Sequence, residues 1–191
     1  MTVLVLGLIL FLGVHSSRIV ASDFRARQIA VRGEGAWKAI YSVASLVGFV
    51  LIVWGYGQTR HEPIELWNPP HFLYPVTSVL MVVAFVLITA AYVRGNRIKA
   101  WVGHPMTLGV KTWAFAHLLS NGRLGDVVLF GAFLAWAVVT YISARKRDRA
   151  AGTVYPVGPV SKDVITVVAG VVVAVVFARW LHLLLIGVQP S

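Results

Sequence analysis

The sequence predicts an all-α fold: a polytopic bundle of about six transmembrane helices that forms a single domain over residues 1–191. Hydrophobic residues make up 58% of the chain, and the mean hydropathy is +0.79. Both values are typical of a protein that crosses a membrane several times. The apolar residues are gathered in six segments, and the basic residues are concentrated in alternate loops between them. The lipid bilayer is therefore the first expected partner.

Window hydropathy divides the chain into six apolar segments. They run roughly over residues 2–20, 37–57, 72–93, 104–121, 124–144 and 163–186. At a rise of 1.5 Å per residue, such lengths suit a hydrocarbon core of about 30 Å. The first segment has no basic stretch in front of it, so we expect a retained helix rather than a cleaved signal peptide.

Two of the segments carry a further pattern. The fourth is the most polar, because it contains Lys111, His117 and Asn121. Polar groups that face lipid are costly, so we expect the other helices to enclose this segment. The sixth carries Gly170, Ala174 and Ala178 at intervals of four, which favours close packing against a neighbouring helix.

The loops fix the predicted orientation. The loops after the first, third and fifth segments are basic; they carry Arg18, Arg25, Arg27, Arg32, Lys38, Arg94, Arg97, Lys99, Arg145, Lys146, Arg147, Arg149 and Lys162. The other two loops carry only Arg60 and Arg123. Because cytoplasmic loops are enriched in Lys and Arg, this alternation predicts a bacterial inner-membrane protein with both termini in the periplasm. It also explains the net charge of +10 without any role for nucleic acid.

Composition excludes or disfavours several kinds of chemistry. The chain has no cysteine, so disulfides and thiolate ligands are excluded. The seven acidic residues lie in predicted loops or at helix ends and form no obvious pair. This disfavours two-metal hydrolysis and glycosidase-like catalysis. No glycine-rich phosphate loop is present in the sequence either.

The histidines are the strongest functional signal. His15 and His117 lie inside apolar segments, His104 opens one, and His71 and His182 lie near the ends of two others. An ionisable ring in hydrocarbon usually has a partner that offsets its cost. That partner is a metal, a haem iron or a polar group on a neighbouring helix. The residues alone leave these alternatives open.

Helical geometry separates the histidines of the fourth segment. His104 and Lys111 are seven residues apart and share one helix face, whereas His117 points roughly 140° away from His104. One planar cofactor is therefore not expected to use both histidines. His117 has Trp113 and Asn121 on its own face. Asn121 or a backbone carbonyl is the expected partner of the second ring nitrogen, the arrangement that orients a ligating imidazole.

Arg18 lies one turn beyond His15, close to the predicted inner membrane surface. An arginine at this depth can pair with a haem propionate or a lipid phosphate. The same topology places His15 in the inner half of the membrane and His117 in the outer half. A set on the outer side, formed by His117 with His71 and His182, is therefore an alternative ligand assignment to His15 with His117.

The whole chain resembles the NnrU family of bacterial membrane proteins. The matching stretches are FLGVHSSR (11–18), YSVASLVGFVLIVWGYG (41–57), LWNPP (66–70), GHPMTLGVKTWAFAHLLSNG (103–122), LFGAFLAWAV (129–138) and LHLLLIGV (181–188). The resemblance implies a link to denitrification, through the expression or activity of nitrite and nitric oxide reductases. A single NnrU-like domain is thus expected over residues 1–191.

The family is similar to the zeta-carotene isomerase of plants and cyanobacteria, and this similarity implies a b-type haem held by membrane histidines. The two ligand positions match His15 and His117, the latter in a Trp-x-x-x-His stretch that begins at Trp113. The isomerase's alternative cysteine ligand falls on Ala114, so a thiolate switch is absent here. The resemblance thus implies haem binding more directly than it implies isomerase chemistry on an apolar substrate.

Two other functions remain open at this stage. His104-Pro105 followed by Gly109 resembles the S-adenosylmethionine motif of isoprenylcysteine-type membrane methyltransferases. Those enzymes also need acidic residues in a C-terminal helix, and the sixth segment has none after Asp163. The other possibility is a non-catalytic assembly factor for nitrite or nitric oxide reductase, in which the histidines pair with polar neighbours.

Overall fold

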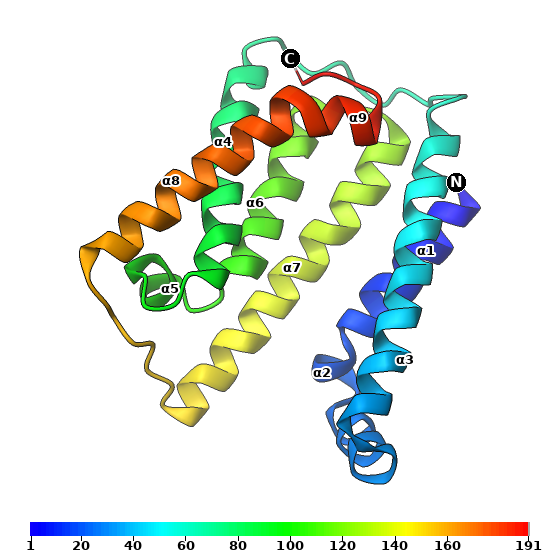
Figure 1. The fold of residues 1–191 in the computed structure, drawn as a ribbon. Helices are drawn as coiled ribbons and strands as arrows, with labels where there is room; N and C mark the ends of the chain where they lie inside the picture. Colours follow the sequence, from blue (N-terminus) through cyan, green and yellow to red (C-terminus); the bar gives the residue numbers. More distant parts are fainter. Residues whose placement is uncertain (191) are drawn as a thin grey trace. The chain divides into compact units, whose positions relative to one another are not determined.

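The computed structural model describes residues 1–190, and helices account for most of them (Figure 1). The elements are α1 (Thr2–His15), α2 (Ser17–Val20), α3 (Ser22–Thr59), α4 (Leu73–Tyr92), α5 (Arg97–Val102), α6 (Pro105–Ser120), α7 (Leu124–Ala151), α8 (Val160–Val176), the π-helix η1 (Phe177–Leu181) and α9 (His182–Ile186). Within residues 1–190 the extended pairing is limited to an isolated bridge between Glu65 and Arg123. The predicted all-α fold class is confirmed.

Four helical stretches are long and apolar enough to cross a membrane: α3, α4, α7 and the run Val160–Ile186. The expected number of about six is not confirmed. The helices of the first and fourth predicted segments, α1 and α6, contain 14 and 16 residues. At 1.5 Å per residue they are only about 21 and 24 Å long, shorter than a hydrocarbon core of about 30 Å.

Several helix boundaries differ from the predicted segments. The first segment breaks near Ser16, and Ala21 leaves helical geometry with φ −142° and ψ 42°. The second helix begins at Ser22, well before residue 37, and bends at Gly33, where φ is 82°. A positive φ of this size is open to glycine but strained for other residues, so the sequence places the bend here.

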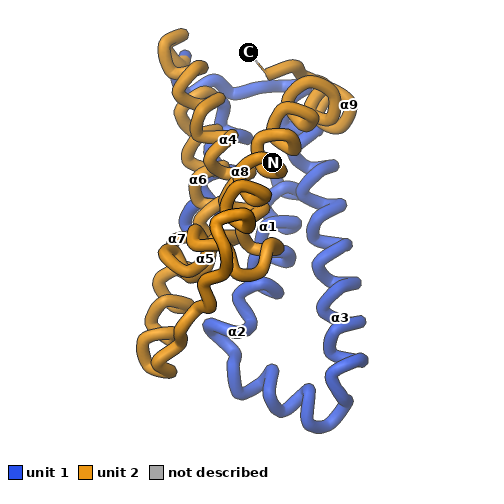
Figure 2. The backbone as a smooth tube through the Cα atoms, turned by 60° about the vertical axis from the view of Figure 1, so that its left-hand side comes forward, with its two compact units in different colours: residues 1–68, 122–136 blue, residues 69–121, 137–191 orange. Residues whose placement is uncertain are grey.

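The chain divides into two compact units (Figure 2). Unit 1 contains Met1–Asn68 and Gly122–Trp136; unit 2 contains Pro69–Asn121 and the chain from Ala137 onwards. In unit 1, α1 packs closely along α3. A Cβ atom built on Gly7 would lie 2.6 Å from the Ile52 nitrogen, and one on Gly48 would lie 2.8 Å from the Phe11 nitrogen. Only glycine allows the two backbones to approach this closely.

In unit 2, α4 is the central helix, with α6 and α8 packed against it. A Cβ on Gly109 of α6 would lie 2.8 Å from Ile88, and one on Gly170 of α8 would lie 2.6 Å from the Val86 Cα. Gly170 and Ala174 are buried, which confirms the predicted small-residue face. Ala178 is exposed instead, because it lies in the π-helix η1, where a wider turn changes the register.

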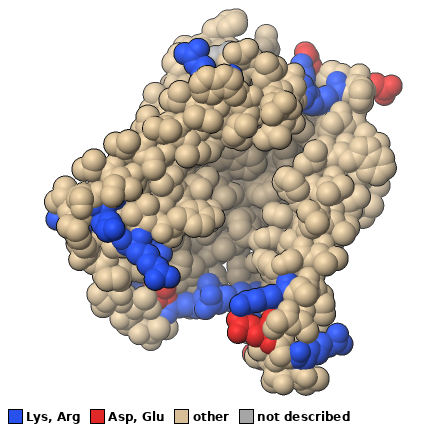
Figure 3. Space-filling model, in the orientation of Figure 1, with Lys and Arg blue, Asp and Glu red and all other residues tan. Residues whose placement is uncertain are grey.

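The outer surfaces of the long helices are strongly apolar. On α8, Val164, Val168 and Val172 are each more than half exposed. In the space-filling view, charged side chains occur mainly near the ends of the helices, and surface without Lys, Arg, Asp or Glu lies between them (Figure 3). A contiguous apolar surface of this kind needs a hydrocarbon partner, so these helices are in contact with lipid.

Candidate functional site

His117 lies near the C-terminal end of α6, in unit 2. Its ring Nδ1 is 3.0 Å from the Trp113 carbonyl oxygen, which is one helical turn earlier. A carbonyl oxygen can only accept, so Nδ1 carries the proton and donates, and in the neutral ring Nε2 bears the lone pair. Asn121 donates to the His117 carbonyl at 2.8 Å and not to the ring. Of the two expected partners, the backbone carbonyl is the one that orients the imidazole.

His117 lines an open cavity of about 300 Å³ that is bordered by α4, α6 and the C-terminal end of unit 2. His182 lines the same cavity. The other lining residues are Tyr74, Thr77, Ser78, Met81, Val82, Phe85, Ser120, Asn121, Ala174, Val175, Phe177, Ala178, Val188, Gln189 and Pro190. The wall is mostly apolar, and hydroxyl and amide groups add a few polar contacts. Such a lining is typical of a pocket for a small molecule or cofactor.

The other two histidines of the outer set differ in position. His182 donates from Nδ1 to the Val188 carbonyl at 2.6 Å, and Phe177 lies edge-on to its ring at 5.9 Å between centroids. His71 does not line the cavity. Its ring packs edge-on against Tyr74, a cavity residue, at 5.5 Å between centroids. The structure therefore brings His117 and His182 to one cavity. His71 lies outside the cavity, against the ring of the lining residue Tyr74.

His15 lies in unit 1, where aromatic rings surround it. Its Nδ1 is 2.7 Å from the Phe11 carbonyl, the same bond to the preceding turn that His117 makes. The Phe11 ring stacks on it at 4.2 Å, and the rings of Tyr41 and Trp136 lie at 5.2 and 6.2 Å. Arg18, one turn further on, is exposed. His15 and His117 thus have equivalent ring orientation, each within its own unit.

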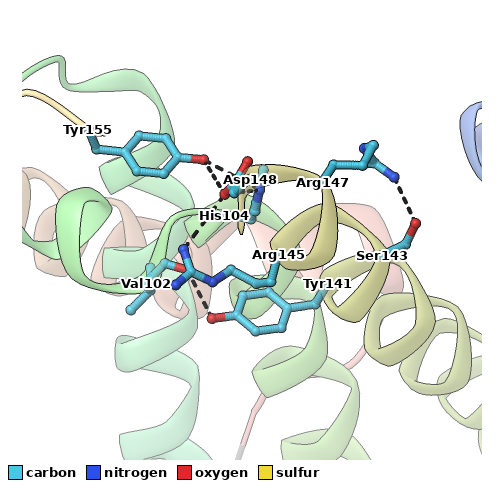
Figure 4. Close-up of polar contacts among 8 residues, drawn as sticks. All are labelled: Val102, His104, Tyr141, Ser143, Arg145, Arg147, Asp148 and Tyr155. Atoms are coloured by element: carbon cyan, nitrogen blue, oxygen red, sulfur yellow. Dashed lines mark hydrogen bonds and ion pairs between the residues drawn. The ribbon is translucent and has the colours of Figure 1, made fainter. Parts of the chain in front are cut away.

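His104 has a different environment at the other end of α6 (Figure 4). Its Nε2 lies 2.9 Å from the Asp148 carboxylate, and the Tyr155 hydroxyl donates to the same oxygen at 2.8 Å. Arg145 lies 3.6 Å from that oxygen. Burial, followed by the bond to Asp148, raises the pKa of the Tyr155 phenol to about 12. In this cluster the Asp148 carboxylate contacts His104 and Arg145 and accepts a further hydrogen bond from the neutral Tyr155 phenol.

The last turns of α7 hold the start of α6. Tyr141 donates to the Val102 carbonyl at 2.9 Å, and Arg145 lies against Gly103, whose φ is +74°. Lys111 lies over the Tyr141 ring, with its Nζ 5.5 Å from the ring centroid. His104 and Lys111 therefore both face α7, as their spacing of seven residues predicts. Neither residue lines the cavity at His117.

Sequence reasoning missed the partners of two polar residues. Asp148 is a lone acid within the basic run RKRDR, a signal that could have marked it as paired. Asp126 is 5% exposed and accepts a 2.6 Å hydrogen bond from Tyr56. Across residues 1–190, no group of three or more His, Asp or Glu side chains could hold a metal ion. A haem iron needs only one or two protein ligands, so haem remains the cofactor to weigh.

These features define an all-helical membrane protein with a histidine-lined apolar cavity. A family model described as NnrU protein matches residues 3–190, nearly the whole chain. The chain therefore belongs to the NnrU family. No curated protein and no solved structure matches it.

Proposed function

We propose that this chain is an integral membrane protein that binds b-type haem, with His117 as an axial ligand. The observation that supports the proposal best is the position of His117: it lines an apolar cavity with its Nδ1 proton held by the Trp113 carbonyl. A ligating histidine usually donates its other ring N–H to a carbonyl or carboxylate, which fixes the tautomer and the ring orientation.

The lining of the cavity suits a porphyrin. Phe85, Phe177 and Met81 offer apolar and polarisable contacts for its faces, whereas Asn121 and Gln189 offer polar contacts for its carboxylates. No Arg or Lys belongs to the lining within residues 1–190. The exposed Arg18, expected from sequence to pair with a propionate, lies in unit 1. When bound, haem would supply redox or gas-binding chemistry, and the chain's part would be to orient His117.

Two histidines are candidates for the opposite axial position. His182 is one candidate, because it lines the same cavity as His117. His15 is the other candidate. Its ring makes the same hydrogen bond to the preceding helical turn as the His117 ring does, and the resemblance to zeta-carotene isomerase implies that it is a ligand. With either choice, two histidine side chains would hold the haem iron.

The cellular role that we propose is in nitrogen-oxide metabolism, as an accessory to nitrite and nitric oxide reductases. Membership of the NnrU family supports this role over an isomerase reaction. Ala114, at the position of the isomerase's alternative thiolate, is fully buried and is not part of the cavity lining.

Visible absorption of the detergent-purified protein tests the proposal. We expect a Soret band from protein expressed with ample haem, its loss in His117→Ala, and its retention in His61→Ala, which replaces an exposed loop histidine. A colourless wild-type protein would remove the haem proposal and leave the assembly-factor role. Binding of S-adenosylmethionine by colourless protein, lost in His104→Ala, would instead favour a methyltransferase.

We also propose a bacterial inner-membrane location with both termini in the periplasm. The alternation of basic and poorly basic loops supports this orientation. Reporter fusions after residue 150 should report the cytoplasm, and fusions at the C-terminal end should report the periplasm. The opposite pair of readings would contradict the orientation.

A further inference from the structure

A short helix precedes the membrane-spanning part of α3 and is separated from it by a bend. It covers residues 22–32, between the non-helical geometry of Ala21 and the positive φ of Gly33. Figure 2 shows the blue chain turning at this end of unit 1 before the long part of α3 begins. The segment is therefore free to take a direction other than that of the membrane-spanning helix.

Two of the three large apolar residues of this short helix, Phe24 and Val31, form a stripe flanked by arginines; the third, Ile29, is partly buried and lies about 140° from Phe24. Phe24 and Val31 are seven residues apart, so they lie about 20° apart around the helix axis. Arg25 and Arg32 form a parallel stripe about 100° away from the first, and Arg27 lies about 60° away on the other side. Apolar residues between arginines on one helix are the pattern of a helix that lies in a membrane interface.

The apolar stripe is open in the structure. Phe24 is 51% exposed and Val31 is 82% exposed, and Val20, just before the helix, is 78% exposed. The Phe24 ring lies edge-on to Trp37 across the bend, at 6.4 Å between centroids. An aromatic pair beside the start of a membrane span is typical of the interface between hydrocarbon and headgroups.

The surrounding charge is positive. Residues 17–38 contain five basic residues and two acidic ones. One of the acids, Glu34, is paired with Lys38 at 2.9 Å, so the arginines dominate the charge around the apolar stripe. Basic side chains are visible at this end of unit 1 in the space-filling view (Figure 3). A partner that complements this surface has an apolar region covered by a layer of negative charge.

We propose that residues 17–32 lie in the headgroup layer of the membrane and bind acidic phospholipid. Phe24 and Val31 enter the outer part of the acyl region, and Arg25, Arg27 and Arg32 contact phosphate groups. The site is independent of the haem proposal, because it uses no residue of the His117 cavity. A bilayer lipid is the occupant, since a soluble anion would satisfy the arginines but not the apolar stripe.

Depth in the membrane tests the apolar half of the site. The chain has no cysteine, so a single introduced cysteine carries a fluorescent probe at one known position. We expect a probe on Val31→Cys to be quenched by spin-labelled lipid in vesicles of phosphatidylcholine and phosphatidylglycerol. A probe on Ala26→Cys, which is exposed on the opposite helix face, is the matched control and should be quenched several-fold less. Equal quenching at the two positions, or none at Val31→Cys, would overturn the proposal. The same results are expected if this face binds an acidic protein and not lipid.

Lipid selectivity tests the basic half. We expect the purified protein to retain phosphatidylglycerol over phosphatidylcholine, measured by native mass spectrometry. Each change among Arg25→Gln, Arg27→Gln and Arg32→Gln should weaken that preference about fivefold, because a basic residue near an anionic surface contributes about 1 kcal/mol. The matching lysine variants should restore it. Unchanged selectivity in the triple glutamine variant, or displacement of the lipid by inorganic phosphate alone, would contradict the proposal.

Discussion

The two ends of α6 carry histidines whose ring nitrogens have different partners. At one end His104 uses Nε2 to bind a carboxylate, with a phenol and a guanidinium beside it. At the other end His117 uses Nδ1 to bind its own helix, so its Nε2 is the basic nitrogen in a residue that lines an apolar cavity. The difference shows that two histidines on one helix can be held through different ring nitrogens.

His104 therefore belongs to a cluster around Asp148 in the last turns of α7, whereas the His117 ring is held by its own helix. The helix between them is fixed by its contact with α4 at Gly109. Changes at either end, or at the shared middle, should then have separable effects on cofactor retention and on stability. The following predictions run from the largest expected effect to the smallest.

The largest effect concerns the ligand opposite His117. We expect only one of His15→Ala and His182→Ala to convert a low-spin haem spectrum to high spin, because only one of these rings can occupy the second axial position. His104→Ala should leave the spectrum unchanged. Visible and electron paramagnetic resonance spectra measure this. Conversion by both variants or by neither would contradict this assignment, and conversion by His104→Ala would break the division between the two ends of α6.

The middle of α6 comes next. Gly109→Val places a side chain where even a Cβ atom would lie 2.8 Å from Ile88. Overpacking of this kind typically costs about 1–3 kcal/mol, so we expect a lower thermal unfolding midpoint and loss of haem together. Gly131→Ala in α7, where nothing lies within 4 Å of the added Cβ, is the control and should be neutral or slightly stabilising. An unaltered midpoint in Gly109→Val would show that α6 and α4 are not closely packed.

The ion pair at His104 should matter for stability alone. Asp148→Asn removes the negative charge of the carboxylate that contacts His104, Tyr155 and Arg145. Loss of a partner for partly buried polar groups costs about 1–3 kcal/mol, which thermal unfolding in detergent should detect. Haem content should stay at the wild-type level. A variant that unfolds normally but loses haem would mean that the cluster serves the cofactor.

The smallest effect is expected from Tyr155→Phe, which removes one hydrogen bond to Asp148 at a cost of about 0.5–1.5 kcal/mol. The pKa of Tyr155, about 12, is raised above its ordinary value. The protonated phenol is thus the form that stabilises the folded state, fully present below about pH 10 and lost as the pH rises through 12. Tyrosinate absorbance should show one fewer late-titrating tyrosine in Tyr155→Phe than in the wild type. Identical late titration in the two proteins would show that the Tyr155 phenol is in contact with water and does not have a raised pKa.

Local patterns were enough to predict much of this protein. Hydropathy predicted the apolar helices, and the fourth predicted segment, residues 104–121, agrees closely with the bounds of α6. The interval of four predicted the buried face of Gly170 and Ala174, and the interval of seven predicted that His104 and Lys111 face one way. These features depend on helix geometry over a few turns, which the order of residues specifies directly.

Other features were decided only when distant segments packed together. His104 and Asp148 are 44 residues apart, and Tyr56 and Asp126 are 70 apart, so no local pattern pairs them. The π-helix η1 turned Ala178 out of the face that its spacing predicted. The cavity combines α4, α6 and the C-terminal residues. Sequence thus determined which residues are polar within apolar helices; tertiary packing decided their partners, because a hydrogen bond depends on separations of a few ångströms that sequence distance does not encode.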